Sequence, residues 1–230
     1  MKICGISDIH GTFIDIPKCD VLCICGDIVN LRDQRSIDDS RSWWYTRFVE
    51  WVNKQPCDKV IITAGNHDFF LEHAYKNNYL SELKQDLSVR TNGKLVILIN
   101  EEYVYKDTKF YGCPFIRPIF YQSSKWAFED DYHGTDNPCC YDSIPKDTNV
   151  LITHDNPHRS KVLAYYVPEG IKYHLYGHWH EGESSEEENL HNCSLLNNMY
   201  NVKEDFKIVS IETSIGEEQL EEEKNEENEN

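Results

Sequence analysis

Short apolar runs and longer amphipathic stretches alternate over the first part of the chain. The short runs, such as residues 20–25, have the length and continuous apolar character of buried strands. The longer stretches mix apolar and charged residues as amphipathic helices do, and the first of them ends near Pro56, which cannot continue a helix. The predicted strands are residues 2–7, 20–25 and 58–63, and the predicted helices are residues 36–55 and 69–86.

Strands dominate the second part of the chain. Three short runs with tight connections predict a meander of strands at residues 94–99, 102–106 and 108–113. Residues 114–147 are rich in proline, aromatic residues and aspartate and predict a long irregular segment, a kind of segment that is often functional. Residues 181–191 are acidic and predict an exposed loop. The remaining predicted strands are residues 149–153, 171–176 and 205–211.

The order of these elements indicates one α/β domain. Strand–helix alternation followed by a strand-rich half favours stacked β-sheets flanked by helices. No internal repeat or linker divides residues 1–214, which we therefore expect to form a single domain. Residues 215–230 are expected to be a disordered acidic tail, because they are dominated by glutamate and lack apolar periodicity.

Five polar clusters occur in order along the chain, and four of them directly follow an apolar, strand-like run. In open α/β folds, the loops beyond the carboxyl ends of strands form the binding crevice. We therefore expect the clusters to meet at one edge of the predicted sheets. The clusters are Asp8-Ile9-His10, Gly26-Asp27, Gly65-Asn66-His67-Asp68, Thr153-His154 and Gly177-His178-Trp179-His180.

Taken one at a time, these clusters have ordinary structural explanations. Asp8 and His10 are separated by one residue, so in extended backbone both side chains would face one cation, yet for such a pair alone a plain surface turn is the favoured explanation. Asp68 is expected to cap the helix that begins at residue 69. His174 lies within a predicted strand and is interpreted as a structural histidine.

Taken together, the clusters indicate a metal site. They combine histidine, aspartate and asparagine side chains in the number that two metal ions need. Nitrogen and oxygen donors of this kind suit borderline divalent metals, whereas a structural zinc site would usually include cysteine thiolates. The sequence therefore predicts a dinuclear metal enzyme that acts on phosphate esters.

The charge of the chain limits the substrates. The formal net charge is −17, and residues 217–230, with eight glutamates and one lysine, contribute −7 of it. The rest of the chain is still acidic, which argues against binding along a long nucleic acid. A small phosphate substrate remains compatible with this charge, because bound cations reverse the local field.

Other features of the composition predict where the protein is located and whether its cysteines form disulfides. No apolar stretch approaches the roughly 20 residues that a membrane span needs, and the chain shows no secretion signal, so a cytoplasmic location is expected. Nine cysteines are present, an odd number, and several lie in apolar runs. Cys23 and Cys25 alternate with apolar residues of a predicted strand, so buried free thiols are favoured over disulfides or a zinc site.

These residues resemble the signature of the calcineurin-like metallophosphoesterases. The family pattern of D-x-H, GD, GNH[DE], H and GHxH is met in order between Asp8 and His180. The segments 111–115 (Tyr-Gly-Cys-Pro-Phe) and 126–128 (Trp-Ala-Phe) are similar to the metallophosphoesterase-domain-containing branch of this family. Asp155-Asn156-Pro157 departs from the pattern of that branch, which has glycine and prolines after the histidine.

The resemblance implies a fold and a set of metal ligands. The fold is a four-layer sandwich of two mixed β-sheets flanked by helices, the metallo-dependent phosphatase fold. Two divalent ions, of manganese, iron, zinc, nickel or cobalt, would be the cofactors, with Asp27 shared between them. His67 would not bind a metal but would face the leaving group, while a hydroxide that bridges the metals attacks phosphorus. The implied metal ligands are Asp8, His10, Asp27, Asn66, His154, His178 and His180.

The same resemblance favours a phosphodiesterase that hydrolyses small diesters such as cyclic nucleotides. A phosphomonoesterase or phosphoprotein phosphatase is the alternative enzyme, and a catalytically silent protein-binding scaffold of the same fold is the alternative without activity. The sequence leaves the substrate-binding residues and the oligomeric state open. Arg117, His158 and Arg159 are interpreted as solvated surface residues, and Trp126 and Phe128 as core residues rather than a platform for a base.

Overall fold

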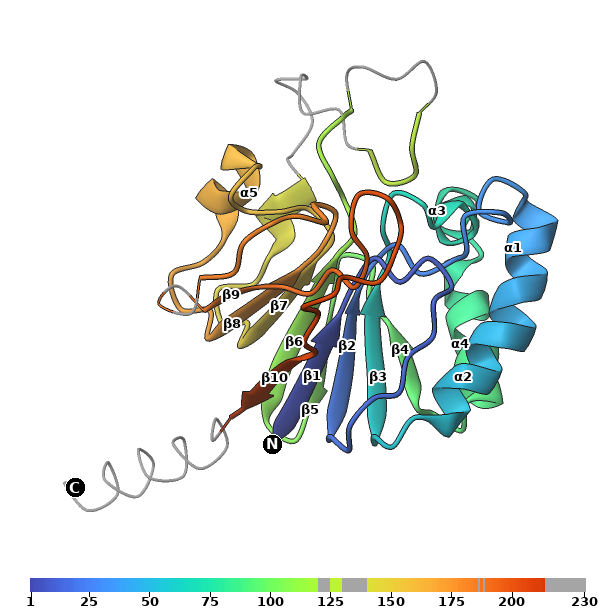
Figure 1. The fold of residues 1–230 in the computed structure, drawn as a ribbon, viewed down its shortest axis with the longest axis horizontal. Coiled ribbons are helices and arrows are strands. Elements are labelled where there is room, and N and C mark those ends of the chain that lie inside the picture. The colour runs from blue at the N-terminus through green and yellow to red at the C-terminus, as the bar shows by residue number, and fades with distance from the viewer. Residues whose placement is uncertain (120–124, 130–139, 186, 188, 214–230) are drawn as a thin grey trace.

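The protein is a four-layer α/β sandwich in which two β-sheets pack face to face and helices cover both outer faces (Figure 1). The computed structural model describes residues 1–119, 125–129, 140–185, 187 and 189–213. The fold class expected from the sequence is confirmed. The acidic tail 215–230 and the aromatic residues Phe120, Tyr121 and Tyr132 lie outside the described residues.

The first sheet has five strands in the order β10-β1-β2-β3-β4. Strands β1 to β4 are parallel, and β10 pairs with β1 in the antiparallel direction. All four parallel strands therefore end at the same edge, which is where a site can form. The strands are β1 (Lys2–Ile6), β2 (Val21–Cys25), β3 (Lys59–Thr63), β4 (Leu95–Ile97) and β10 (Val209–Glu212).

The second sheet also has five strands, in the order β5-β6-β7-β8-β9. Strands β6 to β9 are parallel and β5 forms an antiparallel hairpin with β6. Both sheets are therefore mixed, as the resemblance implied. The strands are β5 (Glu101–Tyr105), β6 (Thr108–Cys113), β7 (Val150–Thr153), β8 (Tyr173–Tyr176) and β9 (Leu190–Asn192).

Helices form the two outer layers (Figure 1). Among the described residues, four α-helices and a π-helical turn lie on the outer side of the first sheet, and a short α-helix and a 3-10 helix lie on that of the second. The helical segments are α1 (Ile37–Trp43), η1 (Trp44–Phe48), α2 (Val49–Lys54), α3 (Phe69–Lys76), α4 (Leu80–Arg90), η2 (Cys140–Ser143) and α5 (Lys161–Tyr166). The helix predicted at 36–55 is thus α1, η1 and α2 joined end to end.

Alternation of side chains along the strands divides the apolar interior into layers. In β2, Leu22 and Ile24 pack beneath the helices, while Val21, Cys23 and Cys25 pack between the two sheets. Every residue of β2 is buried because both faces of the strand are covered. The expectation that Cys23 and Cys25 are buried free thiols is confirmed.

Three predicted elements differ from the structure. The helix expected at 69–86 is two helices, α3 and α4, because Asn78 adopts a left-handed backbone with φ of 59°, which interrupts the helical hydrogen bonds. The three-strand meander is wrong, since β4 pairs with β3 in the first sheet and only β5 and β6 pair with each other. The acidic loop 181–191 ends in strand β9, whose pairing with β8 no local pattern revealed.

Two of the interpretations of single residues need correction. Asp68 occupies the N-cap position of α3 as expected, but its carboxylate makes no capping hydrogen bond to that helix. It instead accepts hydrogen bonds from the backbone N–H groups of Ile28, Val29 and Gly65, and so ties the loop after β2 to the loop after β3. Trp126 is only half-buried, whereas Phe128 is a core residue as expected.

Within the described residues, no helix has the length and apolar character that crossing a membrane would require.

Replacement of Asp68 tests its role in holding the two loops together. Asp68→Ala leaves three buried N–H groups without their acceptor, and we expect the free energy of unfolding to fall by roughly 3 kcal/mol, measured by urea denaturation. Asp147→Ala, which removes an exposed carboxylate paired with Lys109, is the control and should change stability little. Equal urea midpoints for Asp68→Ala and the wild type would contradict this role.

Candidate metal centre

The site forms where the carboxyl ends of strands from both sheets meet. The loops after β1, β2 and β3 come from the first sheet, and those after β7 and β8 come from the second. Ser7, directly after β1, joins the sheets, since its N–H donates to Cys193 O at 2.7 Å and its carbonyl accepts from the N–H of Leu195 at 2.8 Å. All five polar clusters of the sequence are therefore brought to one place.

The backbone at the site is turned, not extended. Asp8, His10, Asp27 and His178 have φ values of 50°, 41°, 53° and 65°, in the left-handed region. The geometric reason given above for the convergence of Asp8 and His10 is thus wrong, although both side chains do reach the site. Non-glycine residues adopt this conformation at a cost, so the surrounding contacts must hold them in place.

Two glycines allow the loops to approach each other. Gly26 has a φ of 93°, and a Cβ there would lie 2.5 Å from Nδ1 of His154. A Cβ on Gly177 would lie 2.0 Å from Oγ of Ser7 and 2.5 Å from Oδ2 of Asp8. Any side chain at either position would push apart the segments that carry the donor residues.

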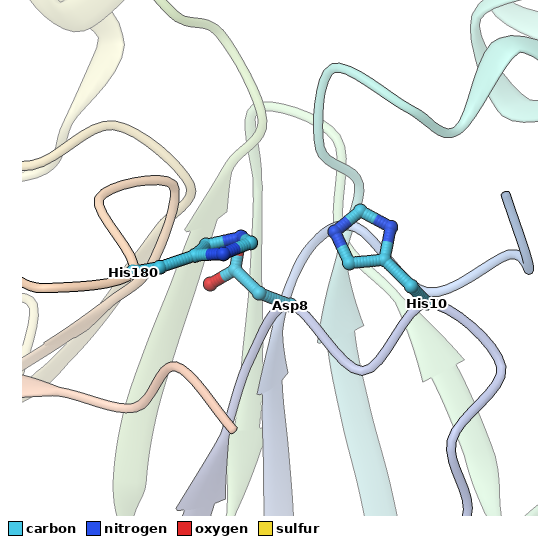
Figure 2. Close-up of side chains that lie close together, drawn as sticks. All are labelled: Asp8, His10 and His180. Carbon is cyan, nitrogen blue, oxygen red and sulfur yellow. The ribbon is translucent and has the colours of Figure 1, made fainter. Parts of the chain in front are cut away.

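Asp8 is held at the junction of the two sheets. Its carboxylate is fully buried, accepts from the N–H of His178 at 3.1 Å and from Oγ of Ser194 at 2.6 Å, and lies 3.5 Å from Nε2 of His180. Figure 2 shows His180 reaching Asp8 from the side opposite His10. Donor atoms of Asp8, His10 and His180 all lie within 4.8 Å of one another, which is close enough to hold one cation.

Asp27 lies at the centre of the cluster. One carboxylate oxygen is 3.3 Å from Nε2 of His154, and the other is 3.7 Å from Nε2 of His10 and 3.8 Å from Nε2 of His67. Asp27 belongs to two further compact sets of donors, one with His10 and His67 and the other with Asp8 and His154. It is therefore the residue of the cluster best placed to serve two cations.

The orientation of the His154 and His180 rings is set by a hydrogen bond that each ring makes through Nδ1. Nδ1 of His154 donates to Cys25 O at 2.7 Å, and Nδ1 of His180 donates to Asn197 O at 2.8 Å. A carbonyl oxygen only accepts, so Nδ1 carries the hydrogen and Nε2 points into the cluster. A metal-binding histidine commonly donates its other N–H to a carbonyl in this way.

The remaining two donor residues border this cluster. Oδ1 of Asn66 lies 2.9 Å from Nε2 of His154, which places a neutral oxygen beside the Asp27 carboxylate. The His178 ring is centred 5.1 Å from that of His154, but His178 is absent from the three compact sets of donors found among the described residues. All seven predicted ligands and His67 thus lie in or next to one cluster.

His10 shows that the donor set fits a metal ion. Both of its ring nitrogens are buried and have no hydrogen-bond partner among the described residues. A buried polar nitrogen without a partner is costly, and a bound cation would satisfy it. The buried carboxylates of Asp8 and Asp27 lie close together and also need positive charge beside them.

The electrostatics of the cluster follow from burial and from the two aspartates. Burial alone would raise the pKa of Asp27, but the facing imidazoles of His154 and His67 hold it well below its usual range, so the carboxylate stays ionised. Burial opposes protonation of His154, yet the charge of Asp27 raises its pKa to about 10. At His10 burial prevails and lowers the pKa to about 4, which leaves a neutral ring able to bind a metal.

A small cavity of about 190 Å³ opens onto the cluster. Its walls add residues that the sequence did not single out, and no local motif marks them. These are Ile119, Asn198 and Tyr200. Trp126, which the sequence marked and placed in the core, also lines the cavity, with its ring centred 4.5 Å from that of His67. Arg117, His158 and Arg159 are exposed, as expected, and do not line the cavity. The lining residues are Asp27, Asn66, His67, Ile119, Trp126, His178, His180, Asn198 and Tyr200.

His174 has the structural role expected of it. It is buried in β8, with Nε2 2.8 Å from the hydroxyl of Thr153, and burial lowers its pKa to about 3. The hydroxyl of Thr153 also donates to Asp155 O at 2.8 Å. This contact steadies the loop after β7, which carries His154.

Two mixed sheets flanked by helices, with aspartate, asparagine and histidine side chains gathered at the strand ends, are the characteristics of the metallophosphoesterase class. Residues 1–182 match the family model described as calcineurin-like phosphoesterase, and the chain belongs to the calcineurin-like phosphoesterase family.

Curated relatives agree with this family. Metallophosphoesterase domain-containing protein 1 of Homo sapiens is 26% identical over 214 residues, which cover 77% of this chain and 60% of that protein. A UPF0046 protein of Caenorhabditis elegans is 25% identical over 201 residues, which cover 79% of this chain and 64% of that protein. The expected resemblance to the metallophosphoesterase-domain-containing branch is confirmed.

A third relative has a name that does not refer to a phosphoesterase. The probable rhamnogalacturonate lyase C of Emericella nidulans is 24% identical over 203 residues, which cover 81% of this chain but only 18% of that protein. The similarity therefore concerns a small part of the lyase. The chain spans less than two thirds of the length of each of these relatives.

The close approach at Gly26 gives a test of the site geometry. In Gly26→Ala the new methyl group would overlap His154, so we expect the bound metal to fall at least tenfold, measured by elemental analysis after dialysis against Mn²⁺. Gly93→Ala is the matched control, because Gly93 also has a positive φ, of 73°, but a Cβ there meets no atom within 4 Å. Metal content that falls equally in both variants would show that backbone strain, not the overlap, is responsible.

Proposed function

We propose that the chain is a dinuclear-metal phosphoesterase that hydrolyses small phosphodiesters, with cyclic nucleotides among the substrates. The observation that carries this proposal is the buried carboxylate of Asp27, which faces three imidazoles and belongs to two compact donor sets. A carboxylate in this position can serve two cations at once, and paired cations are a common device for hydrolysing phosphate esters.

The proposed metal ligands divide into two groups that share Asp27. Asp8, His10 and His180 would hold the first ion with Asp27, supported by their mutual proximity and by the unpartnered nitrogens of His10. The second ion would take its donors from the opposite side of Asp27, where Oδ1 of Asn66 and Nε2 of His154 are 2.9 Å apart. The proposed ligands of the second ion, besides Asp27, are Asn66, His154 and His178.

The protein's own residues then have distinct roles. Bound divalent cations supply charge that neutralises phosphoryl oxygens and lowers the pKa of a water molecule near phosphorus. Asp8 and Asp27 remain ionised and fix the positions of the cations, while Asn66 contributes an oxygen without adding negative charge. His67 lies at the cavity wall with its Nε2 inward, where it can donate a proton to the departing oxygen of the ester.

The cavity supports a small substrate. Its volume of about 190 Å³ suits a phosphate group with part of its esterified group, and the acidic chain disfavours a long nucleic acid. Trp126 and Tyr200 on the cavity wall offer aromatic surface to an attached group such as a base. Free thiols among the described residues support the proposal of a reducing, cytoplasmic setting. They are Cys4, Cys19, Cys23, Cys25, Cys57, Cys113 and Cys193.

The alternatives differ in measurable ways. A phosphomonoesterase or phosphoprotein phosphatase would prefer 4-nitrophenyl phosphate or a phosphopeptide to bis(4-nitrophenyl) phosphate or a cyclic nucleotide. A silent scaffold would bind metal without turnover, but every position of the family signature here is filled by a competent residue, which favours an enzyme.

Replacement of Asp27 tests the dinuclear proposal. Asp27→Ala and Asp27→Asn remove the shared charge, so we expect metal content to fall from two ions per chain towards none, and diester hydrolysis to be lost. Elemental analysis and a bis(4-nitrophenyl) phosphate assay with added Mn²⁺ measure both effects. Asp38→Asn, an exposed residue of α1, is the control. Unchanged metal content and activity in Asp27→Asn would exclude the proposed centre.

Replacement of His67 separates proton donation from metal binding. In His67→Ala, the proposed ligands are intact, so metal content should stay near the wild-type value. Turnover of a diester with a poor leaving group, such as diphenyl phosphate, should fall about 10²–10⁴-fold, because a general acid contributes on this scale. His73→Ala on the exposed side of α3 is the matched control. A His67→Ala enzyme with wild-type turnover of diphenyl phosphate would remove His67 from the mechanism.

A further inference from the structure

A glutamine outside the family signature contacts His67. The side-chain oxygen of Gln34 accepts a hydrogen bond from Nδ1 of His67. Gln34 is half-buried and lies 33 residues from His67 along the chain, in the loop between β2 and α1. Nothing in the local sequence distinguishes it from a solvated loop residue.

The loop that carries Gln34 has its own internal structure. The amide group of Asn30 bonds to Asp33 twice, since its Nδ2 donates to Oδ2 at 2.8 Å and its Oδ1 accepts from the N–H of Asp33 at 2.9 Å. The N–H of Gln34 donates to Asn30 O at 3.2 Å. The backbone at Gln34 is thus hydrogen-bonded to the segment directly after Asp27. The position from which the Gln34 side chain reaches His67 is therefore fixed.

The residue after Gln34 supports His67 from another side. The guanidinium carbon of Arg35 lies 4.3 Å from the ring centroid of Trp126 and 4.4 Å from that of Phe69, and Arg35 also donates to Lys125 O at 3.2 Å. The ring of Trp126 is centred 4.5 Å from that of His67. Gln34 and Arg35 therefore restrain one imidazole together, the first by a hydrogen bond and the second through an indole ring.

We propose that Gln34 is a positioning residue that holds His67 with Nδ1 protonated and Nε2 turned towards the reacting phosphate. This inference rests on the proposed function of His67 as a proton donor. An amide oxygen only accepts hydrogen bonds, so contact with Gln34 requires a hydrogen on Nδ1. Nε2, which lies 3.8 Å from Asp27, is then the nitrogen that gains and loses the catalytic proton.

A neutral partner suits this position for an electrostatic reason. The cluster already contains the buried carboxylates of Asp8 and Asp27, and a third carboxylate beside His67 would add negative charge where a phosphate ester must bind. An amide fixes the tautomer and the ring orientation without adding charge. Gln34 thus orients His67 and leaves the charge of the cavity to the metal ligands and the cations.

The test compares two diaryl phosphates whose leaving groups differ in their need for a proton. Gln34→Met has a similar length but no acceptor, and we expect turnover of diphenyl phosphate to fall about 10–100-fold. Turnover of bis(4-nitrophenyl) phosphate should fall less than threefold, because 4-nitrophenolate departs without protonation. Metal content should equal that of the wild type. Gln85→Met, the same change at an exposed position of α4, is the control and should alter neither rate.

Gln34→Glu retains an acceptor for Nδ1 and should restore turnover of diphenyl phosphate to within fivefold of the wild type, the remaining loss being due to the added negative charge. Equal losses on both substrates in Gln34→Met, or loss of bound metal, would overturn the positioning role and indicate a structural one. A wild-type protein that hydrolyses neither diester would instead refute the proposed function. Wild-type activity with an unaffected Gln34→Met refutes only the inference on Gln34.

Discussion

The burial of two carboxylates at the junction of two sheets is the constraint on which the site depends. Asp8 and Asp27 are almost fully shielded from water, and ionised groups in such a place require hydrogen bonds and positive charge. Backbone N–H groups, a serine hydroxyl and the imidazoles of His67, His154 and His180 provide part of this compensation. The unpartnered nitrogens of His10 mark where a bound cation would complete this compensation.

The architecture places those carboxylates by a simple topological means. Parallel strands end at the same edge of a sheet, and each sheet has a parallel set that ends at the site. One sheet alone would provide a row of loops, whereas two sheets packed face to face provide donors from both sides of a cation. Ser7 and Gly177 are the points of closest approach between the two sets of loops.

Groups that never face the cavity set the geometry of those that do. Asp68 fixes the loop after β2 to the loop after β3, the carbonyl oxygens of Cys25 and Asn197 orient two imidazoles, and Gln34 contacts a third. Such contacts determine which nitrogen of each ring faces the cluster. The left-handed backbone at Asp8, His10 and Asp27 is held by the same network, including the hydrogen bond from the N–H of His10 to Asp27 O at 3.0 Å.

The sequence by itself determined the order and most of the bounds of the strands, the α/β class, and which aspartate, asparagine and histidine residues gather at the strand ends, because apolar runs and short motifs are local patterns. It could not place β4 and β9 in their sheets, since strand pairing joins residues that are distant along the chain. It also misjudged Asp68 and Trp126, whose partners lie on other elements. Only the tertiary structure decided the turned backbone at Asp8, the tautomers of His154 and His180, and the contact of Gln34 with His67. These features depend on distances between segments that are far apart along the chain, and a local sequence pattern does not specify those distances.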